Sequence, residues 1–570
     1  MTSPDASPTL PRRTTPRPDA ATLAAVALLT LGALFLLYAS RHMTFFSDDW
    51  SFIETRRAIS ADALLESHNG HMTLVPVVIY QLLFAIFGLS SYLPYLVVLI
   101  ALHVTACASV FVLARRYVGG VAALVPMVLL LFLGAAYEDL LWAFQITLVG
   151  STAFGLLGLV LLGREGRRSD VGAAIALFAS VACSGVGVAF LAGAAVELLL
   201  RRDWRRLWVA GIPIFLYLCW YVGYGGDQEK ATAANLANAP QYVSDAAAGA
   251  AAAIGGLTYN WGAPLLLFGI LAVWVARRAQ LDPRELGPRF AALLTVALVN
   301  WGLTALTRGQ LNDPAGSRYL YAGSALLLVL AVAPLRPPRR DVRLAAAALV
   351  LTGAAVLSNV GALRDGQRLW RGYADQVKAA VTALDVAGRT APADLRPVLG
   401  YSPQIVSGEY LDAVDDIGSS PGFSPAELLT ATAATRASVD ATLTGVAAAG
   451  IRPLPRGERA SAGGTAPTVD DAAGGDARVR GACVRFTPSA AGATLQLSAA
   501  PGETLTFRPA ARGAAVPLWL RRYGDEFPTD PVTSLAPGVV TEVALPRDTQ
   551  PQQVWRLRVV PARPLVACRD

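Results

Sequence analysis

Lysine is almost missing from this chain of 570 residues, in which Lys230 and Lys378 are the only two. Arginine therefore carries nearly all of the positive charge, and the formal net charge is +7. The arginines are spread over short loops, and no run combines them with stacking aromatic residues. This pattern excludes a nucleic-acid-binding patch. Together with abundant alanine and glycine, the low lysine content also predicts a GC-rich genome.

Cysteine is scarce as well, with five residues and no C-x-x-C spacing of the kind that binds a metal. Cys107, Cys183 and Cys219 fall in apolar runs, where a cysteine is most simply a small core residue. Cys483 and Cys568 bracket the C-terminal region. A disulfide between these two requires an oxidising compartment.

Hydrophobic residues, by contrast, make up 54% of the chain, and the mean hydropathy is +0.45. Several apolar runs approach the ~20 residues that cross a bilayer, so we expect an α-helical polytopic membrane protein. The first run is not followed by a small-residue cleavage site and is expected to remain as a helix. The candidate segments are 20–39, 72–89, 92–114, 119–136, 146–163, 171–183, 185–200, 207–223, 259–276, 290–306, 318–334 and 343–360.

Segment 72–89 decides the topology, because it holds a proline and a glutamine and can lie in the outer interface instead of spanning. If it does not span, the arginine-rich loops face the cytoplasm, as the positive-inside rule requires. That solution predicts about eleven spans within residues 20–360. It places the protein in the cell (plasma) membrane. It also predicts a disordered cytoplasmic tail (1–19), outer loops 41–91 and 137–145, and an extracytoplasmic C-terminal region. The arginine-rich loops lie around 115–116, 164–168, 201–206, 277–289 and 336–343.

Apolar runs stop after about residue 361. Residues 361–451 are expected to form a helical or mixed extracytoplasmic region, in which 365–388 is typical of an amphipathic helix. The Pro/Gly/Ala-rich stretch 452–478 is expected to be a linker. Short alternating runs separated by turn residues then predict a β-sandwich over 479–570, with its ends tied by the Cys483–Cys568 bridge.

Two adjacent carboxylates, Asp48 and Asp49, come directly after the first span. Such a pair is costly to desolvate at a membrane and tends to persist where it binds a cation, accepts a proton or grips a polar ligand. His68 and His71 lie in the same loop. The ordinary alternatives are acids that cap or solvate a helix, surface histidines, and Asn69-Gly70 as the stop of a short helix.

The second outer loop contains Glu138 and Asp139, with Gln145 close to the next apolar run. The alternative to a functional role here is an interfacial aromatic belt with solvating acids.

The fifth outer loop contains Arg308, and Arg318 with Tyr319 begins the following span. A guanidinium at this level is suited to grip a phosphate by paired hydrogen bonds. The alternative is an arginine–tyrosine pair that snorkels to the interface.

The order and spacing of these motifs resemble the GT-C membrane glycosyltransferases, the superfamily that includes protein O-mannosyltransferases and the lipid A aminoarabinose transferase. The resemblance covers about residues 20–360 and, with the residue usage, implies a bacterial, actinobacterial member. Asp48-Asp49-Trp50 corresponds to the acidic motif after the first helix, and Glu138-Asp139 to the second acidic motif. The Lys-Pro-Pro-Leu element of the mannosyltransferase-like branch is absent, and the stretch from His68 to Pro76 takes its place, so its donor contacts do not carry over.

The resemblance implies a GT-C-like fold and a polyprenyl-phosphate sugar as the donor. A carboxylate would accept the proton of an acceptor hydroxyl in an inverting displacement, with Asp49 as first choice and Asp48 as second. Arg318, with Arg308, would stabilise the departing phosphate. The residues expected to hold the sugar, orient the substrates or assist the base are Glu138, Asp139, His68, His71, Gln145 and Tyr319.

The cofactor and the acceptor stay open. No cofactor is required, but a divalent cation such as Mg or Mn at Asp48 and Asp49 is an alternative that no ligand spacing establishes. The acceptor is a cell-wall glycan, a glycolipid or a protein. Three other classes also stay open: a transporter or flippase, a non-enzymatic membrane scaffold with a glycan-binding outer domain, and a glycan ligase or polymerase of a different fold.

Overall fold

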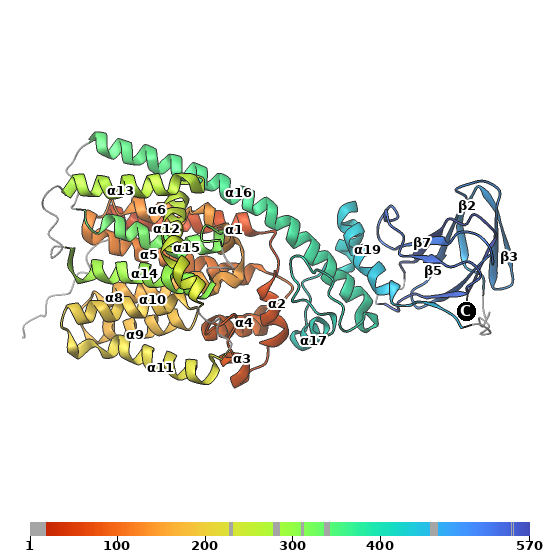
Figure 1. Ribbon diagram of the computed structural model, residues 1–570, viewed down its shortest axis with the longest axis horizontal. Helices are drawn as coiled ribbons and strands as arrows, with labels where there is room; N and C mark the ends of the chain where they lie inside the picture. The colour runs from red at the N-terminus through yellow and green to blue at the C-terminus, as the bar shows by residue number, and fades with distance from the viewer. Residues whose placement is uncertain are drawn as a thin grey trace, which may run out of the picture.

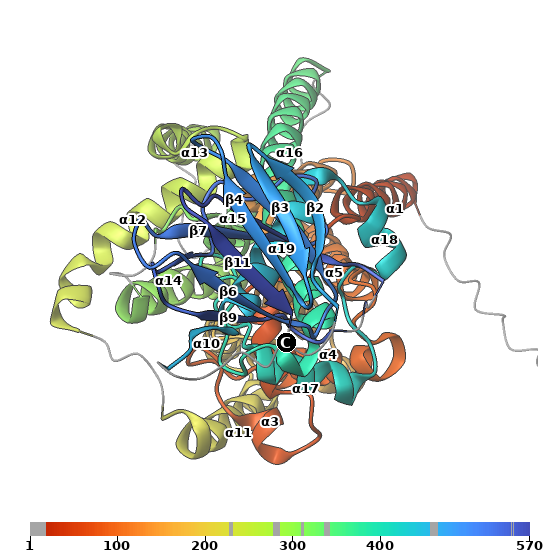
Figure 2. The same ribbon diagram turned by 90° about the vertical axis from the view of Figure 1, so that its right-hand side faces the viewer.

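The computed structural model describes residues 19–226, 232–277, 286–308, 313–335, 342–455, 465–548, 550 and 552–569. The molecule is elongated, with a helical bundle at one end and a β-sandwich at the other (Figure 1). Viewed from the sandwich end, the strands lie in front of the bundle (Figure 2), so the two parts are stacked along the long axis. A helical protein with a C-terminal β-sandwich is the fold class that the sequence predicts.

The bundle consists of long apolar helices, and several of the short helices, among them α2, α3 and α4, lie at the end that faces the sandwich (Figure 1). The long helices are α1 (Ala20–Ser40), α5 (Leu93–Val118), α8 (Ile146–Leu162), α9 (Arg167–Val181), α10 (Val186–Leu200), α11 (Trp208–Tyr224), α12 (Ala233–Gly255), α13 (Gly262–Arg277), α14 (Gly287–Arg308), α15 (Ser317–Val332) and α16 (Val342–Ala387). The shorter ones are α2 (Asp48–Thr55), α3 (Ala61–Leu65), α4 (Leu74–Phe87), α6 (Leu124–Leu131) and α7 (Tyr137–Leu141).

Seven helices among the described residues are long and apolar enough to cross a membrane, or up to eight if α12 and the following helix, bent by 104°, form one broken span. The chain is thus a multi-pass membrane protein. The sequence predicted about eleven spans. The difference arises because α9, α10 and α15 have only 15, 15 and 16 residues. At 14 residues, α4 is also too short to cross a bilayer at 1.5 Å per residue, as expected for a non-spanning 72–89.

Two helices differ from the sequence prediction. The stretch after residue 225 was expected to be loop, yet α12 forms there, because alanine favours a helix although the segment is not strongly apolar. The span 343–360 and the amphipathic stretch 365–388 form one continuous helix, α16, of 46 residues. No proline interrupts this helix, and one of its glycines, Gly366, allows close packing. A β-carbon at Gly366 would lie 2.2 Å from the Tyr137 ring.

Asn359 fixes the middle of α16 against the bundle. It is buried, its Oδ1 accepts the backbone N–H of Ala135 at 3.0 Å, and its Nδ2 donates to the carbonyl of Ala253 at 3.0 Å. Ala135 belongs to the 3-10 helix η1 (Gly134–Ala136), which leads into α7. One amide therefore holds α16, α12 and the start of α7 together.

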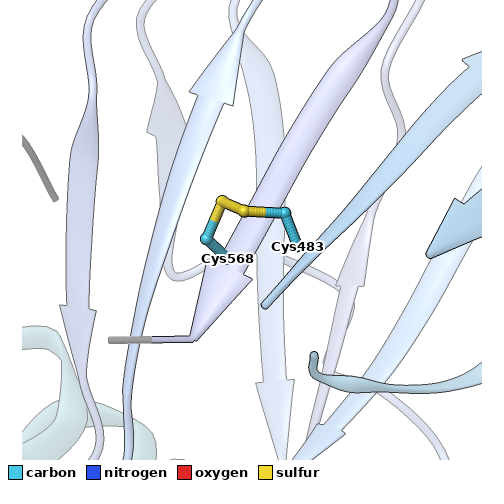
Figure 3. The surroundings of a disulfide bond; sticks show 2 residues. All are labelled: Cys483 and Cys568. Atoms are coloured by element: carbon cyan, nitrogen blue, oxygen red, sulfur yellow. A yellow bond between two sulfur atoms is a disulfide. The ribbon is translucent and has the colours of Figure 1, made fainter. Parts of the chain in front are cut away.

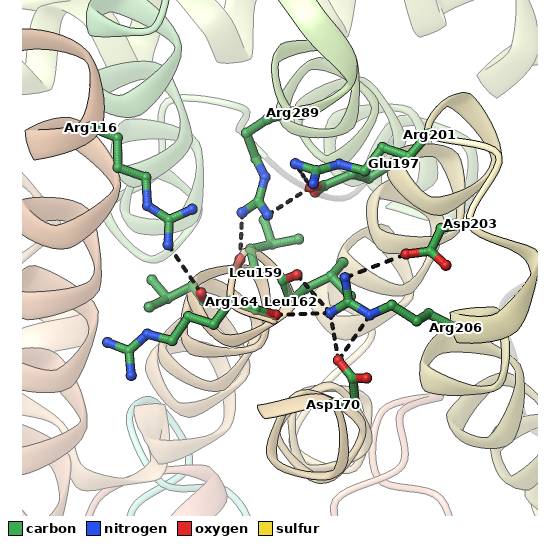
Figure 4. Close-up of polar contacts among 11 residues, drawn as sticks. Arg116, Leu159, Leu162, Arg164, Asp170, Glu197, Arg201, Asp203, Arg206 and Arg289 are labelled. Atoms are coloured by element: carbon green, nitrogen blue, oxygen red, sulfur yellow. Dashed lines mark hydrogen bonds and ion pairs between the residues drawn. The ribbon is translucent and has the colours of Figure 1, made fainter. Parts of the chain in front are cut away.

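At the end of the bundle away from the sandwich, arginines cap the C-terminus of α8 (Figure 4). The last carbonyls of a helix have no partner within it, and cations near that end are favourable. Here α5, α14 and the 3-10 helix η3 (Trp204–Arg206) supply the donors. The donor–acceptor pairs are Arg289 with Leu159, Arg116 with Val160 (3.4 Å), and Arg206 with Leu162 (2.9 Å) and Arg164 (3.1 Å).

The C-terminal sandwich has a six-stranded antiparallel sheet in the order β1-β9-β6-β11-β4-β3 and a five-stranded antiparallel sheet in the order β2-β5-β10-β7-β8. Its strands are β1 (Ile451–Pro453), β2 (Thr468–Ala473), β3 (Gly475–Arg480), β4 (Cys483–Pro488), β5 (Thr494–Ala499), β6 (Thr504–Pro509), β7 (Val516–Arg521), β8 (Thr533–Leu535), β9 (Thr541–Ala544), β10 (Trp555–Val559) and β11 (Leu565–Arg569). The first three strands lie in the predicted linker 452–478, because their exposed, polar composition hides the alternation.

The predicted disulfide between Cys483 and Cys568 is present (Figure 3). The two residues face each other in register on the neighbouring strands β4 and β11, so the bridge joins the last strand to β4, and not to the first strand as the sequence predicted. Between bundle and sandwich lie α17 (Ser407–Ile417), α18 (Pro425–Thr430) and α19 (Ala433–Ala448).

Candidate active site

A cavity of about 540 Å³ lies at the end of the bundle that faces the sandwich. It is enclosed by the first outer loop, the segment before α8, the α9–α10 turn, and parts of α11, α12, α14 and α15. This volume suits a small polar ligand with its substituents. The lining includes six of the residues that the sequence singled out: Asp48, His68, His71, Gln145, Arg318 and Tyr319.

A two-residue turn brings the two histidines together. His68 and His71 exchange both backbone hydrogen bonds, at 3.0 and 2.9 Å. Asn69 and Gly70 between them have φ angles of 51° and 76°, which is the conformation of a type I′ hairpin turn. Residues paired in this way present their side chains on the same face, and both imidazoles line the cavity. Asn69-Gly70 is thus a hairpin turn and does not end a helix, since α3 stops at Leu65.

Asp48 and His68 form the acid–imidazole pair of the cavity wall. Asp48 Oδ1 lies 4.0 Å from His68 Nε2, and it also accepts the side-chain N–H of Gln404 at 3.3 Å. The His68 ring contacts both Phe52 and Phe144, with each ring centroid 5.3 Å away, and these two rings also contact each other at 5.2 Å. The aromatic rings restrict the imidazole, so its orientation toward Asp48 is fixed by packing.

Asp49 points the other way, into the protein. Its carboxylate is fully buried and accepts hydrogen bonds from Tyr80 Oη, from Tyr92 Oη at 2.8 Å and from Trp142 Nε1 at 3.1 Å. The backbone N–H of Phe46 donates to it at 2.9 Å. Burial raises the pKa of Asp49 to about 7, although these donors favour the charged form. Asp49 does not line the cavity, so the structure places the two acids in different environments.

The different orientations of Asp48 and Asp49 affect the prediction of a divalent cation bound by this pair. A metal site made by the acid pair requires both carboxylates to converge, and they do not. Within the described residues no group of three histidine, cysteine, aspartate or glutamate side chains is arranged to hold a metal ion.

Residues 402–406 from the region beyond α16 brace the acidic loop. Ser402 Oγ accepts the backbone N–H of Ser47 at 2.9 Å, and the Glu54 carboxylate accepts the backbone N–H of Val406 at 3.2 Å. Ser47 has a φ of 45°, which is unusual for a residue with a side chain. The conformation of the residue before Asp48 is therefore supported by a segment some 350 positions further along the chain.

Arg318 provides the positive charge of the cavity. It lies in the first turn of α15, at the positive end of the helix dipole. Its side chain is exposed to the cavity, and its guanidinium lies 5.4 Å from the Tyr319 ring. Among the described residues no carboxylate comes within ion-pair distance of it. The Arg308 side chain lies outside the described residues.

Glu138 and Asp139 stand behind Arg318 in α7 and do not line the cavity. The charge of Arg318 acts on both carboxylates. Asp139 is fully buried, and neither of its oxygens has a hydrogen-bond partner in the described part of the chain. The second acidic motif is thus placed to act on Arg318 and not on a ligand directly.

Four buried polar atoms of the cavity wall lack hydrogen-bond partners among the residues that the structure describes. They are Thr73 Oγ1, Gln145 Oε1, Ser184 Oγ and Trp301 Nε1. Each such group costs about 1–3 kcal/mol if it stays unsatisfied, so their convergence in one cavity calls for a polar partner. Together they offer hydroxyls, an amide oxygen and an indole N–H, which match a ligand rich in hydroxyl groups.

Sequence reasoning missed three of these four residues, along with other polar lining residues. Thr73, Ser184 and Trp301 sit in or beside apolar runs, where a single polar residue is ordinary. The one signal was that Ser184 alone separates the apolar segments 171–183 and 185–200, which requires a tight turn between them. The remaining polar lining residues that it missed are Thr147, Tyr217, Tyr221, Tyr242, Asn300, Thr304 and Thr307.

No family model matches the chain, and no curated protein matches it. The solved structures that are similar to it include two of ArnT from Cupriavidus metallidurans, one bound to undecaprenyl phosphate and one in the apo state. They are 14% and 15% identical in sequence, with a TM-score of 0.40 in each case. Each comparison covers 66% of this chain and 82% of the ArnT chain. With similarity at this level, the function has to be inferred from the residues of this chain.

Proposed function

We propose that this protein is a membrane glycosyltransferase that moves a sugar from a polyprenyl-phosphate donor to an acceptor hydroxyl on the extracytoplasmic side. One observation carries the proposal: a single cavity at the end of a membrane bundle holds a cation, a carboxylate and four unsatisfied polar atoms. The cation suits a phosphate, the carboxylate suits a proton transfer, and the polar atoms suit the hydroxyls of a sugar.

The donor phosphate would bind at Arg318 and the first turn of α15. The guanidinium and the positive end of the helix dipole both favour an anion there. Because no described carboxylate neutralises Arg318 at ion-pair distance, its charge is available for the phosphate. The sugar would then meet Thr73, Gln145 and Ser184, and the lipid tail would leave the cavity between the helices.

Asp48 is the better candidate for the base, because it lines the cavity and Asp49 does not. It would accept the proton of the acceptor hydroxyl as that oxygen bonds to the anomeric carbon. The bond from that carbon to the phosphate oxygen breaks in the same step, and its electron pair leaves with the polyprenyl phosphate. Arg318 would stabilise the growing charge, and attack from the opposite face inverts the anomeric centre.

In this proposal Asp49 is a positioning residue. Its hydrogen bonds to Tyr80, Tyr92 and Trp142 tie α2 to α4, α5 and the segment before α8. Since Asp48 is the neighbouring residue on α2, these bonds fix where its carboxylate stands.

The arginine end of the bundle indicates the orientation in the membrane. Arg116, Arg206 and Arg289 gather there, whereas the cavity is at the other end. The positive-inside rule then assigns the arginine end to the cytoplasm. In this arrangement the N-terminus is cytoplasmic, and the cavity and the sandwich are extracytoplasmic.

The test is transfer from a radiolabelled polyprenyl-phosphate sugar pool in membranes that contain wild type, Asp48→Asn or Arg318→Gln at equal protein levels. We expect product with wild type and a loss of about 100-fold or more with either variant. The matched controls are Asp365→Asn and Arg368→Gln, which change an exposed pair on α16. Full activity of Asp48→Asn would overturn the assignment of the base. Binding without transfer by wild type would favour a transporter or a scaffold.

A further inference from the structure

A second cluster of unusual chemistry lies on the outer face of the five-stranded sheet. Along β7 and β10, Leu518, Leu520 and Leu557 point into the sandwich and are buried. Successive residues of a strand point to opposite faces, so the residues between them occupy the outer face. These outer-face residues are Trp519, Arg521, Arg556 and Arg558.

Aromatic rings and guanidinium groups interleave in this cluster. The guanidinium of Arg558 lies 4.4 Å from the centre of the Trp519 ring and 4.7 Å from that of Phe527. The guanidinium of Arg521 also contacts Phe527, 4.9 Å from the centre of its ring. Such cation–π contacts hold the charged groups flat against the rings and restrict their motion. The cluster is therefore an ordered surface and not a set of mobile side chains.

Two of the arginines of this cluster face each other across neighbouring strands. Arg556 stands directly opposite Arg521 in the β10–β7 register, and like charges in that position are unfavourable. Within the described part of the chain, no carboxylate forms an ion pair with Arg521, Arg556 or Arg558. This arrangement keeps three positive charges together without an ion-paired carboxylate.

The nearest acids are occupied elsewhere. Those that act electrostatically on Arg521 are Asp440, Asp470 and Asp525. Asp440 accepts three backbone N–H groups at 2.8 Å each, from residues 522–524. Asp470 accepts the Ser498 hydroxyl at 2.6 Å, and Asp525 pairs with Arg436. The positive charge of the sheet face is thus left for a partner outside the chain.

We propose that this face, made of Trp519, Arg521, Phe527, Arg556 and Arg558, binds an anionic polysaccharide. Guanidinium groups pair with carboxylate or phosphate groups, and aromatic rings contact the apolar faces of sugar rings. On the same face, Gln496 and Ser498 of β5 stand opposite Arg558 and Arg556 and add hydrogen-bonding groups.

The position of the sandwich favours a polymer over a lipid surface. The sandwich is at the far end of the long axis, and α17, α18 and α19 separate it from the helical bundle (Figure 1). A bilayer around the bundle would not reach this face. The site goes beyond the proposed transfer reaction and does not depend on it, because binding is measured without a donor.

The test is binding of the full-length protein, in nanodiscs of uncharged lipid, to three immobilised polymers: polygalacturonate, poly(glycerol phosphate) and neutral pullulan. The first two distinguish a carboxylate from a phosphate as the recognised group. We expect wild type to bind one or both polyanions and not pullulan. Arg556→Gln/Arg558→Gln should weaken that binding by about tenfold or more.

The matched control removes the same charge from the other sheet. Arg485 and Arg508 are exposed and flank Val566 of β11, so Arg485→Gln/Arg508→Gln should leave binding within about twofold of wild type. The single variant Arg556→Gln, which touches no ring, serves if the double variant fails to fold. Equal weakening by both double variants, equally tight binding of pullulan, or no binding of either polyanion would overturn the proposal.

Discussion

The Nδ1 atom of His71 lies 2.9 Å from the point where a β-carbon at Gly185 would stand. Carbon and nitrogen atoms that are not bonded do not approach so closely, so the α9–α10 turn leaves room for this imidazole only with a glycine at that position. Gly185 has an ordinary φ of −57°, which any residue adopts. The constraint is therefore the histidine itself and not the backbone.

Gly185→Ala should consequently displace the His71 ring without disturbing the fold. We expect transfer activity to fall by about 10- to 100-fold, as a displacement near 1 Å in a catalytic site does, while the melting temperature changes little. The measurement is sugar transfer alongside thermal unfolding. Gly211→Ala is the control, because nothing lies within 4 Å of the added β-carbon. In a His71→Ala background, Gly185→Ala should cause no further loss of transfer activity. An additive loss would contradict the explanation that Gly185→Ala acts by displacing the His71 ring.

The buried carboxyl of Asp49 makes stability depend on pH. Its pKa is about 7 in the folded protein against 3.8 for the ordinary group, so the folded state holds a proton that the unfolded state releases. Stability is then fully present below about pH 4 and is lost as the pH rises through about 7. The difference of roughly 3 pKa units corresponds to about 4 kcal/mol at most. Glu54, whose pKa burial raises to about 8, acts in the same direction.

We therefore expect the melting temperature of wild type to fall between pH 5 and pH 8, and Asp49→Asn to flatten part of that slope. Glu54→Gln should flatten another part, and the double variant most of it. The exposed Asp365→Asn should leave the slope unchanged. An identical slope in wild type and Asp49→Asn would show that Asp49 is charged throughout this range.

The sequence predicted the membrane class, the sandwich and the disulfide, because these depend on composition, alternation and cysteine position. It also led to six of the cavity residues, since polar groups next to a span are costly and therefore noticeable. It ranked Asp49 above Asp48 as the base, whereas only Asp48 lines the cavity. The carboxylate that turns inward is the one that accepts hydrogen bonds from Tyr80, Tyr92 and Trp142. The sequence around the acid pair does not identify these partners.

The number of long helices was harder to predict for a related reason. Apolar content identifies a helix, but the point where it bends or stops depends on its packing. The segment from Leu124 to Leu141 is interrupted where Gly134 passes Asn359, whose carbonyl oxygen lies 1.8 Å from the position of an added β-carbon. A contact across more than two hundred residues sets that break. For the same reason, the bracing of the acidic loop by Ser402 has no signature in the sequence around either residue.

Ser402→Ala tests that bracing. The change removes the acceptor of the Ser47 N–H in a buried position and should destabilise the loop by about 1–3 kcal/mol. Because Asp48 is the next residue, transfer should fall more than global stability does. The measurements are the transfer rate and the melting temperature. Ser438→Ala, which removes an exposed hydroxyl bonded within α19, is the control. If Ser402→Ala lowers the melting temperature but leaves the transfer rate unchanged, the role of Ser402 is purely structural.

The arginine end of the bundle should contribute to stability without affecting the chemistry. Glu197 is fully buried, and Arg289 and Arg201 each approach its Oε1 at 2.7 Å (Figure 4). Arg289→Met removes one of these partners and the cap of the Leu159 carbonyl, and should cost about 3–5 kcal/mol. Adding Glu197→Gln should recover part of the loss, because the charge left without its partner disappears. The melting temperatures of the single and double variants measure this coupling.

Transfer by Arg289→Met at a temperature where it stays folded should match wild type. Leu159, whose carbonyl Arg289 caps, and the cavity residue Gln145 are 14 positions apart, so about 21 Å of helix separates them. At this distance a lost cap changes the position of Gln145 only if the whole helix shifts. Arg205→Gln, an exposed change at the same end, is the matched control. A strong loss of transfer in the folded Arg289→Met protein would show that α8 moves as a rigid rod and carries the disturbance to the cavity.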